Sequence, residues 1–324
     1  MRCITLTLFT ILSLASPALA RDISLGLPID CTLGATCYIQ NFVDTDPTDA
    51  ASDFNCGPLT YDGHKGTDFA LPTSQKLRDN VDVLAASAGI VVATRDGMVD
   101  HLQGTEGAPD VTGVECGNGL VINHGAGWVT QYCHMKQGSL RVQKGDRVQK
   151  GTVLGHVGLS GKTEFPHVHL VVRKDDKVVD PFRTIPAPVC GENKPDMLWD
   201  TPLSYQTTGV LSIGVASKVP DYTDVKAGTA QQAQLTTNSP ALVVFGFAFG
   251  GQQGDVMRLQ LTDPNGKQIA RHDATLRKNK AQYFNAAGRK SATGWPAGDY
   301  LAKVEIIRDG TVMDAQTDRI TVTK

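Results

Sequence analysis

Five residues capable of metal binding or proton transfer lie in three short stretches of this sequence. "YDGHKGTD" carries His64 and Asp68, "TQYCHM" carries His134, and "FPHVHLVV" carries His167 and His169. The last stretch is rich in β-formers, and successive side chains of a strand point to opposite faces. His167 and His169 are therefore predicted to project to the same side of a strand, roughly 7 Å apart.

The residue types in these stretches match a catalytic zinc site. Such a site has three protein ligands, here imidazoles and a carboxylate, at about 2.0–2.2 Å, and an open fourth position. Taken alone, His64 and Asp68 are better explained as part of a turn, because Gly63 and Gly66 argue against a helix that would place both on one face. Together with the His-x-His pair, they supply a carboxylate and enough imidazoles for one metal ion.

The stretches "GHKGTD", "YCHM" and "PHVHL" resemble the lysostaphin/LytM-type (M23) zinc metalloendopeptidases, which carry His-x3-Asp, then a histidine, then His-x-His. The glycine-punctuated "VQKGDRVQKGTVLGHVG" adds to the resemblance, which covers roughly residues 61–182. It implies a mostly antiparallel β fold with a groove, known as the duplicated hybrid motif. It also implies peptidases that cut peptide cross-links in bacterial peptidoglycan.

The resemblance further implies a role for each of the five residues. His64, Asp68 and His169 match the ligands of one Zn²⁺ per chain. His134 and His167 match two catalytic histidines that assist a metal-activated water. Which of these two accepts a proton stays open, as does the bond cleaved, a glycine bridge or a cross-link through D-amino acids.

Other function classes fit less well. A catalytically weak or inactive relative, acting as a cell-wall-binding or amidase-activating module, is disfavoured because all five residues are present. D-Ala-D-Ala carboxypeptidases place their first His and Asp farther apart, and a biotinyl or lipoyl carrier needs a Met-Lys-Met that "HMKQ" does not match. A nucleic-acid partner is disfavoured because 31 Lys+Arg nearly balance 33 Asp+Glu.

The first twenty residues, "MRCITLTLFTILSLASPALA", have the basic start, apolar stretch and small-residue end of a secretory signal peptide, 1–20. No later segment is apolar enough to span a membrane. We therefore expect an exported protein without a membrane anchor, in the periplasm rather than the extracellular medium.

Cysteine usage agrees with export. Cys3 leaves with the signal, so six of the seven cysteines remain, an even number that favours disulfides but permits many pairings. A hairpin folded about "NHGAG" would bring Cys116 opposite Cys133. Cys31–Cys37 could close a local loop, which leaves Cys56–Cys190 by elimination.

Short strands separated by glycines predict an all-β chain. The predicted order is an extension at 21–55 that could cover the groove, a zinc peptidase domain at 56–190, a proline-bearing linker at 191–208, and a domain of unknown role at 209–324. The last domain is predicted to be an immunoglobulin-like β-sandwich, with hairpin turns at Asn265-Gly266 and Asp309-Gly310.

Residues 95–115 of the peptidase domain are predicted to form a long loop able to border a cleft. Three further histidines of this domain are expected to have no catalytic role. His124 and His156 are assigned to the scaffold, and His101 to solvent.

Overall fold

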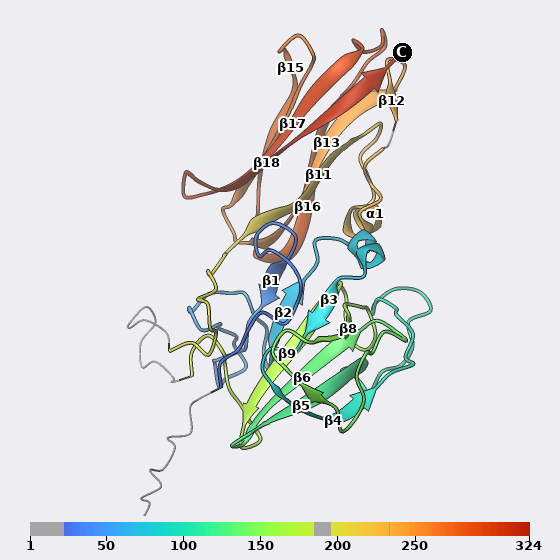
Figure 1. Ribbon diagram of the computed structural model, residues 1–324. Coiled ribbons are helices and arrows are strands. Elements are labelled where there is room, and N and C mark those ends of the chain that lie inside the picture. Colours follow the sequence, from blue (N-terminus) through green and yellow to red (C-terminus); the bar gives the residue numbers. More distant parts are fainter. Residues whose placement is uncertain (1–22, 185–195, 233) are drawn as a thin grey trace, which may run out of the picture.

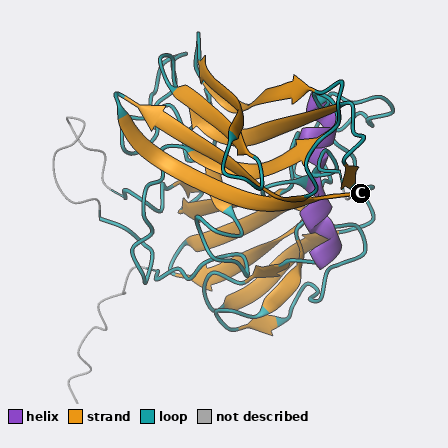
Figure 2. Cartoon of the chain, turned by 90° about the horizontal axis from the view of Figure 1, so that it is seen from above, coloured by secondary structure: helices purple, strands orange, loops and turns teal. Residues whose placement is uncertain are grey.

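The computed structural model describes residues 23–184, 196–232 and 234–324, so the predicted signal peptide lies outside the described residues. The described chain is almost entirely β, which confirms the predicted fold class. Its two helical segments lie together on one side of the molecule (Figure 2). None of the helices in the described ranges has the length and apolarity needed to cross a bilayer.

The first group of elements builds the lower half of Figure 1 around one large sheet. The elements are β1 (Tyr38–Asn41), β2 (Thr67–Ala70), the 3-10 helix η1 (Ser74–Asp79), β3 (Asp82–Leu84), β4 (Gly89–Arg95), β5 (Asn118–Gly125), β6 (Trp128–Met135), β7 (Arg147–Val148), β8 (Val153–His156), β9 (His167–Lys174) and β10 (Lys177–Val178). Strands of the large sheet run in the order β1-β2-β9-β6-β5-β4-β7, with β10 also paired to β9. The separate β3–β8 pair forms a small second sheet.

Alternation along β9 explains why this strand carries both core and site residues. Val168, Leu170 and Val172 are buried in the hydrophobic core. His167 and His169, at the intervening positions, project from the opposite face. One face of β9 therefore packs in the core, and the other face carries the two histidines.

The second group of elements forms two packed sheets in the upper half of Figure 1. The elements are β11 (Gly209–Ala216), α1 (Tyr222–Ala227), β12 (Leu235–Thr236), β13 (Ala241–Gly251), β14 (Val256–Thr262), β15 (Gln268–Thr275), β16 (Lys280–Lys290), β17 (Gly298–Arg308) and β18 (Thr311–Thr323). The sheet β11-β13-β16 and the sheet β12-β18-β17-β14-β15 share a core that includes Val244, Leu259 and Val304.

Both predicted hairpin turns of this second group are confirmed. Asn265-Gly266 joins β14 to β15, and Asp309-Gly310 joins β17 to β18. Gly266 and Gly310 both have a positive φ, as tight turns of this kind require. The arrangement is a two-sheet sandwich, and its assignment to the immunoglobulin-like class stays a prediction.

The segments on either side of the first group pack onto its core. The extension contributes β1 to the large sheet and Leu25 to the core. Leu25 bridges Trp199, whose ring lies 5.7 Å from Phe69 and 5.3 Å from Phe182. Residues of the predicted extension and of the predicted linker therefore belong to the same hydrophobic cluster.

Two of the predicted disulfides are present, Cys31–Cys37 and Cys116–Cys133. Cys56 is also disulfide-bonded. Its predicted partner, Cys190, lies outside the described residues. The 95–115 segment contains no regular element after Arg95, as predicted for a loop.

Candidate metal centre and active site

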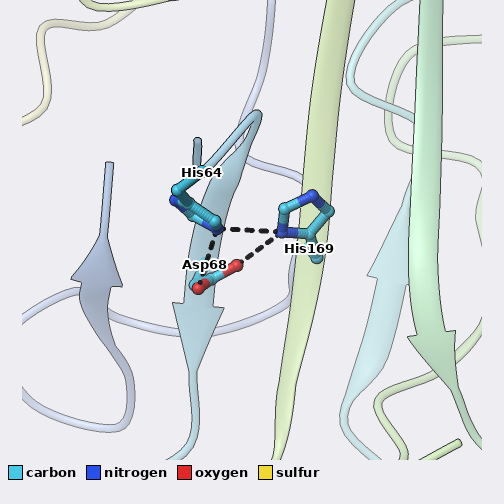
Figure 3. Close-up of side chains that lie close together, drawn as sticks. All are labelled: His64, Asp68 and His169. Carbon is cyan, nitrogen blue, oxygen red and sulfur yellow. Dashed lines mark hydrogen bonds and ion pairs between the residues drawn. The ribbon is translucent and has the colours of Figure 1, made fainter. Parts of the chain in front are cut away.

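Strands β2 and β9 bring three potential metal ligands together (Figure 3). Asp68 and His169 are direct partners across this antiparallel pair, so their side chains share one face. His64 arrives from the turn before β2, where its N–H donates to the Tyr61 carbonyl. Potential ligand atoms of the three residues all lie within 4.8 Å of one another.

The potential metal-ligand atoms of His64, Asp68 and His169 face one another. His64 Nε2 lies 3.2 Å from His169 Nδ1 and 3.2 Å from Asp68 Oδ2, and His169 Nδ1 lies 2.7 Å from Asp68 Oδ1. His64 Nδ1 lies 2.7 Å from the Phe42 carbonyl, to which an Nδ1–H would donate, leaving the Nε2 lone pair directed at the other two residues. Two imidazoles and one carboxylate facing one another at these distances are a donor set that fits a divalent ion.

Burial and close contact between charged groups shift the pKa values of these residues. Desolvation acts to raise the pKa of Asp68, but the neighbouring His64 and His167 outweigh it and hold that pKa well below its usual value. Burial acts to lower the pKa of His64, but the Asp68 carboxylate outweighs it and raises that pKa. For His169, burial dominates and the pKa is lowered. The cluster thus holds an ionised carboxylate ready to balance a cation.

The two remaining predicted residues, His134 and His167, lie beside these three. The ring centroids of His134 and His167 are 4.6 Å apart, and His134 lies 5.9 Å from His169. Nε2 of His167 is 3.4 Å from Asp68 Oδ1. The structure therefore brings all five sequence-predicted residues into one cluster.

His134 has an unusual backbone conformation. Its φ of 62° is in the left-handed region, which non-glycine residues seldom occupy. The conformation is held because its N–H donates to the Cys116 carbonyl at 2.8 Å and its carbonyl accepts from Gly158 at 3.0 Å. His134 Nδ1 lies 2.8 Å from the Ser160 carbonyl. Burial and the nearby His167 lower the pKa of His134 well below its usual value.

A groove lies on the same face of the sheet as the cluster. Cys133 is the direct partner of His169, and Gln131, two residues earlier on β6, therefore faces the same side. Gln131 lines a groove of about 300 Å³ together with Arg95, Val121 and residues 113–117, the first three of which end the long loop. The predicted loop does border a cleft.

Sequence inspection missed the residues that orient the cluster. Asn41 donates from Nδ2 to Asp68 Oδ2 at 2.8 Å, and Thr163 Oγ1 lies 3.1 Å from His167 Nδ1. Asn41 belongs to the predicted extension, and no spacing in the sequence links it to Asp68. Only the pairing of β1 with β2 brings these two side chains together.

The histidines assigned to the scaffold lie apart from the cluster. His124 contacts the Ala88 carbonyl and Thr130 Oγ1, both at 2.8 Å. His156 Nδ1 lies 2.9 Å from Asp82 Oδ1. These contacts agree with a role in holding loops and strands together.

Comparison with known proteins places part of the chain in a family. Residues 62–181 match the family described as Peptidase family M23. The peptidoglycan DD-endopeptidase ShyA of Vibrio cholerae is 32% identical over 112 residues, which are 34% of this chain and 20% of that protein. The DD-carboxypeptidase/endopeptidase Mpg of Neisseria meningitidis is 30% identical over 114 residues, 35% of this chain and 24% of that protein. The chain thus spans about a fifth to a quarter of the length of these relatives.

Among solved structures, the catalytic domain of the antimicrobial peptidase lysostaphin from Staphylococcus simulans is 23% identical. The match covers 39% of this chain and 82% of that one, with a TM-score of 0.28. A zinc-containing peptidase from Vibrio cholerae is 24% identical over 44% of this chain and 38% of that one, with a TM-score of 0.29. These TM-scores are low, and the assignment depends on the sequence match alone. The match to peptidase family M23 covers residues 62–181 and does not extend to the rest of the chain.

Proposed function

We propose that this protein is a zinc-dependent endopeptidase that hydrolyses peptide cross-links of bacterial peptidoglycan. The observation that carries the proposal is the convergence of His64, Asp68 and His169 beside two further buried histidines, on a sheet face that also holds a groove. The curated relatives named as peptidoglycan DD-endopeptidases support this substrate class.

His64, Asp68 and His169 would hold one Zn²⁺ per chain. When bound, zinc polarises a scissile carbonyl and lowers the pKa of a coordinated water to about 7. The protein's contribution is the preset geometry. Asn41 fixes one oxygen of Asp68, and the Phe42 carbonyl fixes the His64 ring, so the ligands need little rearrangement on binding the ion.

His134 is suited to accept a proton. An Nδ1–H donated to the Ser160 carbonyl leaves the Nε2 lone pair free, and the lowered pKa keeps the ring neutral at pH 7. A neutral imidazole beside the metal site can take the proton of an attacking water.

His167 is suited to donate a hydrogen bond. Its Nδ1 faces the Phe165 carbonyl at 2.9 Å, and its Nε2 faces the Asp68 carboxylate. An N–H at Nε2 would lie at the metal-site end of the ring, where it could donate to the oxyanion or to the leaving amine. In this proposal, His134 accepts a proton and His167 donates a hydrogen bond.

The compartment we propose is the periplasm. The disulfides Cys31–Cys37 and Cys116–Cys133 are of a kind that persists in oxidising, extracytoplasmic environments. A substrate in the cell wall likewise lies outside the cytoplasmic membrane.

The test is digestion of purified cell walls of different cross-link chemistry, with new amino termini identified by mass spectrometry. We expect release of peptides by the wild type and loss of both zinc and activity in H169A. H134A and H167A should retain zinc while losing about 10²–10⁴ in rate. H272A, in the exposed part of β15, is the matched control and should behave as wild type. Full zinc occupancy in H169A, or a wild type that binds zinc but releases no peptide, would overturn the proposal.

A further inference from the structure

The second, C-terminal group of strands lies against the same sheet face that carries the metal centre. Tyr38, Ala70 and His167 are successive partners across β1, β2 and β9, so their side chains share that face. The Tyr38 ring packs on Phe249 with centroids 4.5 Å apart, and Gln282 Nε2 donates to the Tyr38 hydroxyl at 2.8 Å. Strands β13 and β16 therefore cover the β1 edge of the metal-site face.

Phe165 connects the active-site histidines to this cover. Its ring stacks on His167, with centroids 4.3 Å apart and planes 22° apart. Phe165 also lines a small interdomain cavity together with Glu164, Lys226 and Phe247. The Phe165 ring thus lies between His167 and the residues of the second domain that line this cavity.

Tyr222, the first residue of α1, lies next to one wall of this cavity, because its ring centroid is 6.1 Å from that of Phe247. Figure 1 shows α1 at the junction of the two halves, beside η1. The Tyr222 ring stacks on Phe284, with centroids 5.4 Å apart and planes 9° apart, and Lys226 Nζ lies 5.9 Å from the Tyr222 centroid. Burial, together with the nearby Glu164 carboxylate, raises the pKa of the Tyr222 hydroxyl.

The Tyr222 side chain is only partly buried by these contacts. The helix is anchored by Val225, which is fully buried, whereas Tyr222 is 39% exposed. A flat aromatic side chain supported from behind by a second ring, partly open to solvent and flanked by a lysine, is a surface that binds peptide groups and carboxylates.

We propose that the C-terminal domain borders the substrate site on the β1 side of the metal centre, and that Tyr222 and Lys226 bind the carboxylate-bearing peptide strand next to the scissile bond. This inference rests on the proposed function. Phe284 holds the Tyr222 ring in place, Tyr222 stacks on the peptide, and Lys226 pairs with its carboxylate. The domain then determines which cross-linked peptides reach His134 and His167.

The experiment measures kcat and KM of the full-length zinc-loaded protein on soluble cross-linked wall peptides with free or amidated side carboxylates. In Y222A, KM should rise by roughly five- to tenfold with kcat and zinc content unchanged. Y222F retains the ring and should keep the wild-type KM. K226M should lose the preference for free over amidated carboxylates. T223A, the next and exposed position of the same helix, is the control.

The outcomes separate the two proposals. A wild type that releases no new amino termini overturns the proposed function, and this inference with it. A wild type that hydrolyses the peptides, with an unchanged KM in Y222A and an unchanged carboxylate preference in K226M, overturns this inference alone. If Y222A melts early, Y222L replaces it, because leucine keeps apolar contact with Phe284 but cannot stack.

Discussion

Removal of the Cys116–Cys133 disulfide in C116A/C133A should reduce both stability and catalysis. The bond joins residues 17 apart in sequence. For a loop of that length, the chain-entropy relation gives a loss of about 3 kcal/mol in the free energy of unfolding. Because this disulfide ties the strand end before His134 to the loop residue that accepts its N–H, its loss should also affect the active site.

The catalytic part of the prediction follows from the backbone of His134. A left-handed φ at a non-glycine residue costs roughly 1–2 kcal/mol and persists only when the surroundings enforce it. Once Cys116 is free to move, the His134 ring is no longer held in its position and can shift. A misplacement of about 1 Å is enough to lower a rate by about 10². We therefore expect kcat to fall roughly ten- to a hundredfold.

Cys31–Cys37 provides the matched control. It closes a loop of sequence separation 6, for which the same relation gives about 2 kcal/mol. C31A/C37A should therefore lose comparable stability and keep its kcat. Urea unfolding, zinc content and steady-state hydrolysis would be measured on both variants. Equal kcat values in the two variants at temperatures where both are folded would refute the positioning role of Cys116–Cys133.

Three further variants test other parts of the structure. In G66A, the added Cβ would lie 2.7 Å from the His169 ring and from a backbone carbonyl, so zinc affinity measured by chelator competition should fall; wild-type affinity would contradict the close approach. Burial raises the pKa of Asp180 to about 7, so the folded state binds a proton that the unfolded state has released, and wild-type stability should fall between about pH 4 and pH 7. D180N, which cannot ionise, should be the more stable protein at pH 8, by about 4 kcal/mol at most, and parallel pH profiles of melting temperature would count against this. R308M should lose about 3–5 kcal/mol in urea unfolding, because it leaves the buried Asp255 carboxylate without the two hydrogen bonds of 2.8 and 2.7 Å that Arg308 donates; a loss below 1 kcal/mol would indicate a solvated pair.

The sequence by itself was enough to select the residues that form the cluster. His64, Asp68, His134, His167 and His169 could be selected because their types and local spacing are unusual, and because strand alternation places His167 and His169 on one face whatever the rest of the fold. The hairpin turns and the Cys116–Cys133 pairing were also accessible. These features depend on residues close in sequence, where backbone geometry alone sets the distances.

Only the tertiary structure decided what surrounds the site. Asn41 reaches Asp68 because β1 pairs with β2, and Lys226 lines the same cavity as Phe165 because the second domain packs on β1. No local sequence pattern predicts either contact, because each joins segments that are far apart in the chain. Contacts of this kind are set by how whole strands and sheets bury their apolar faces, a sum over many residues that no short motif contains.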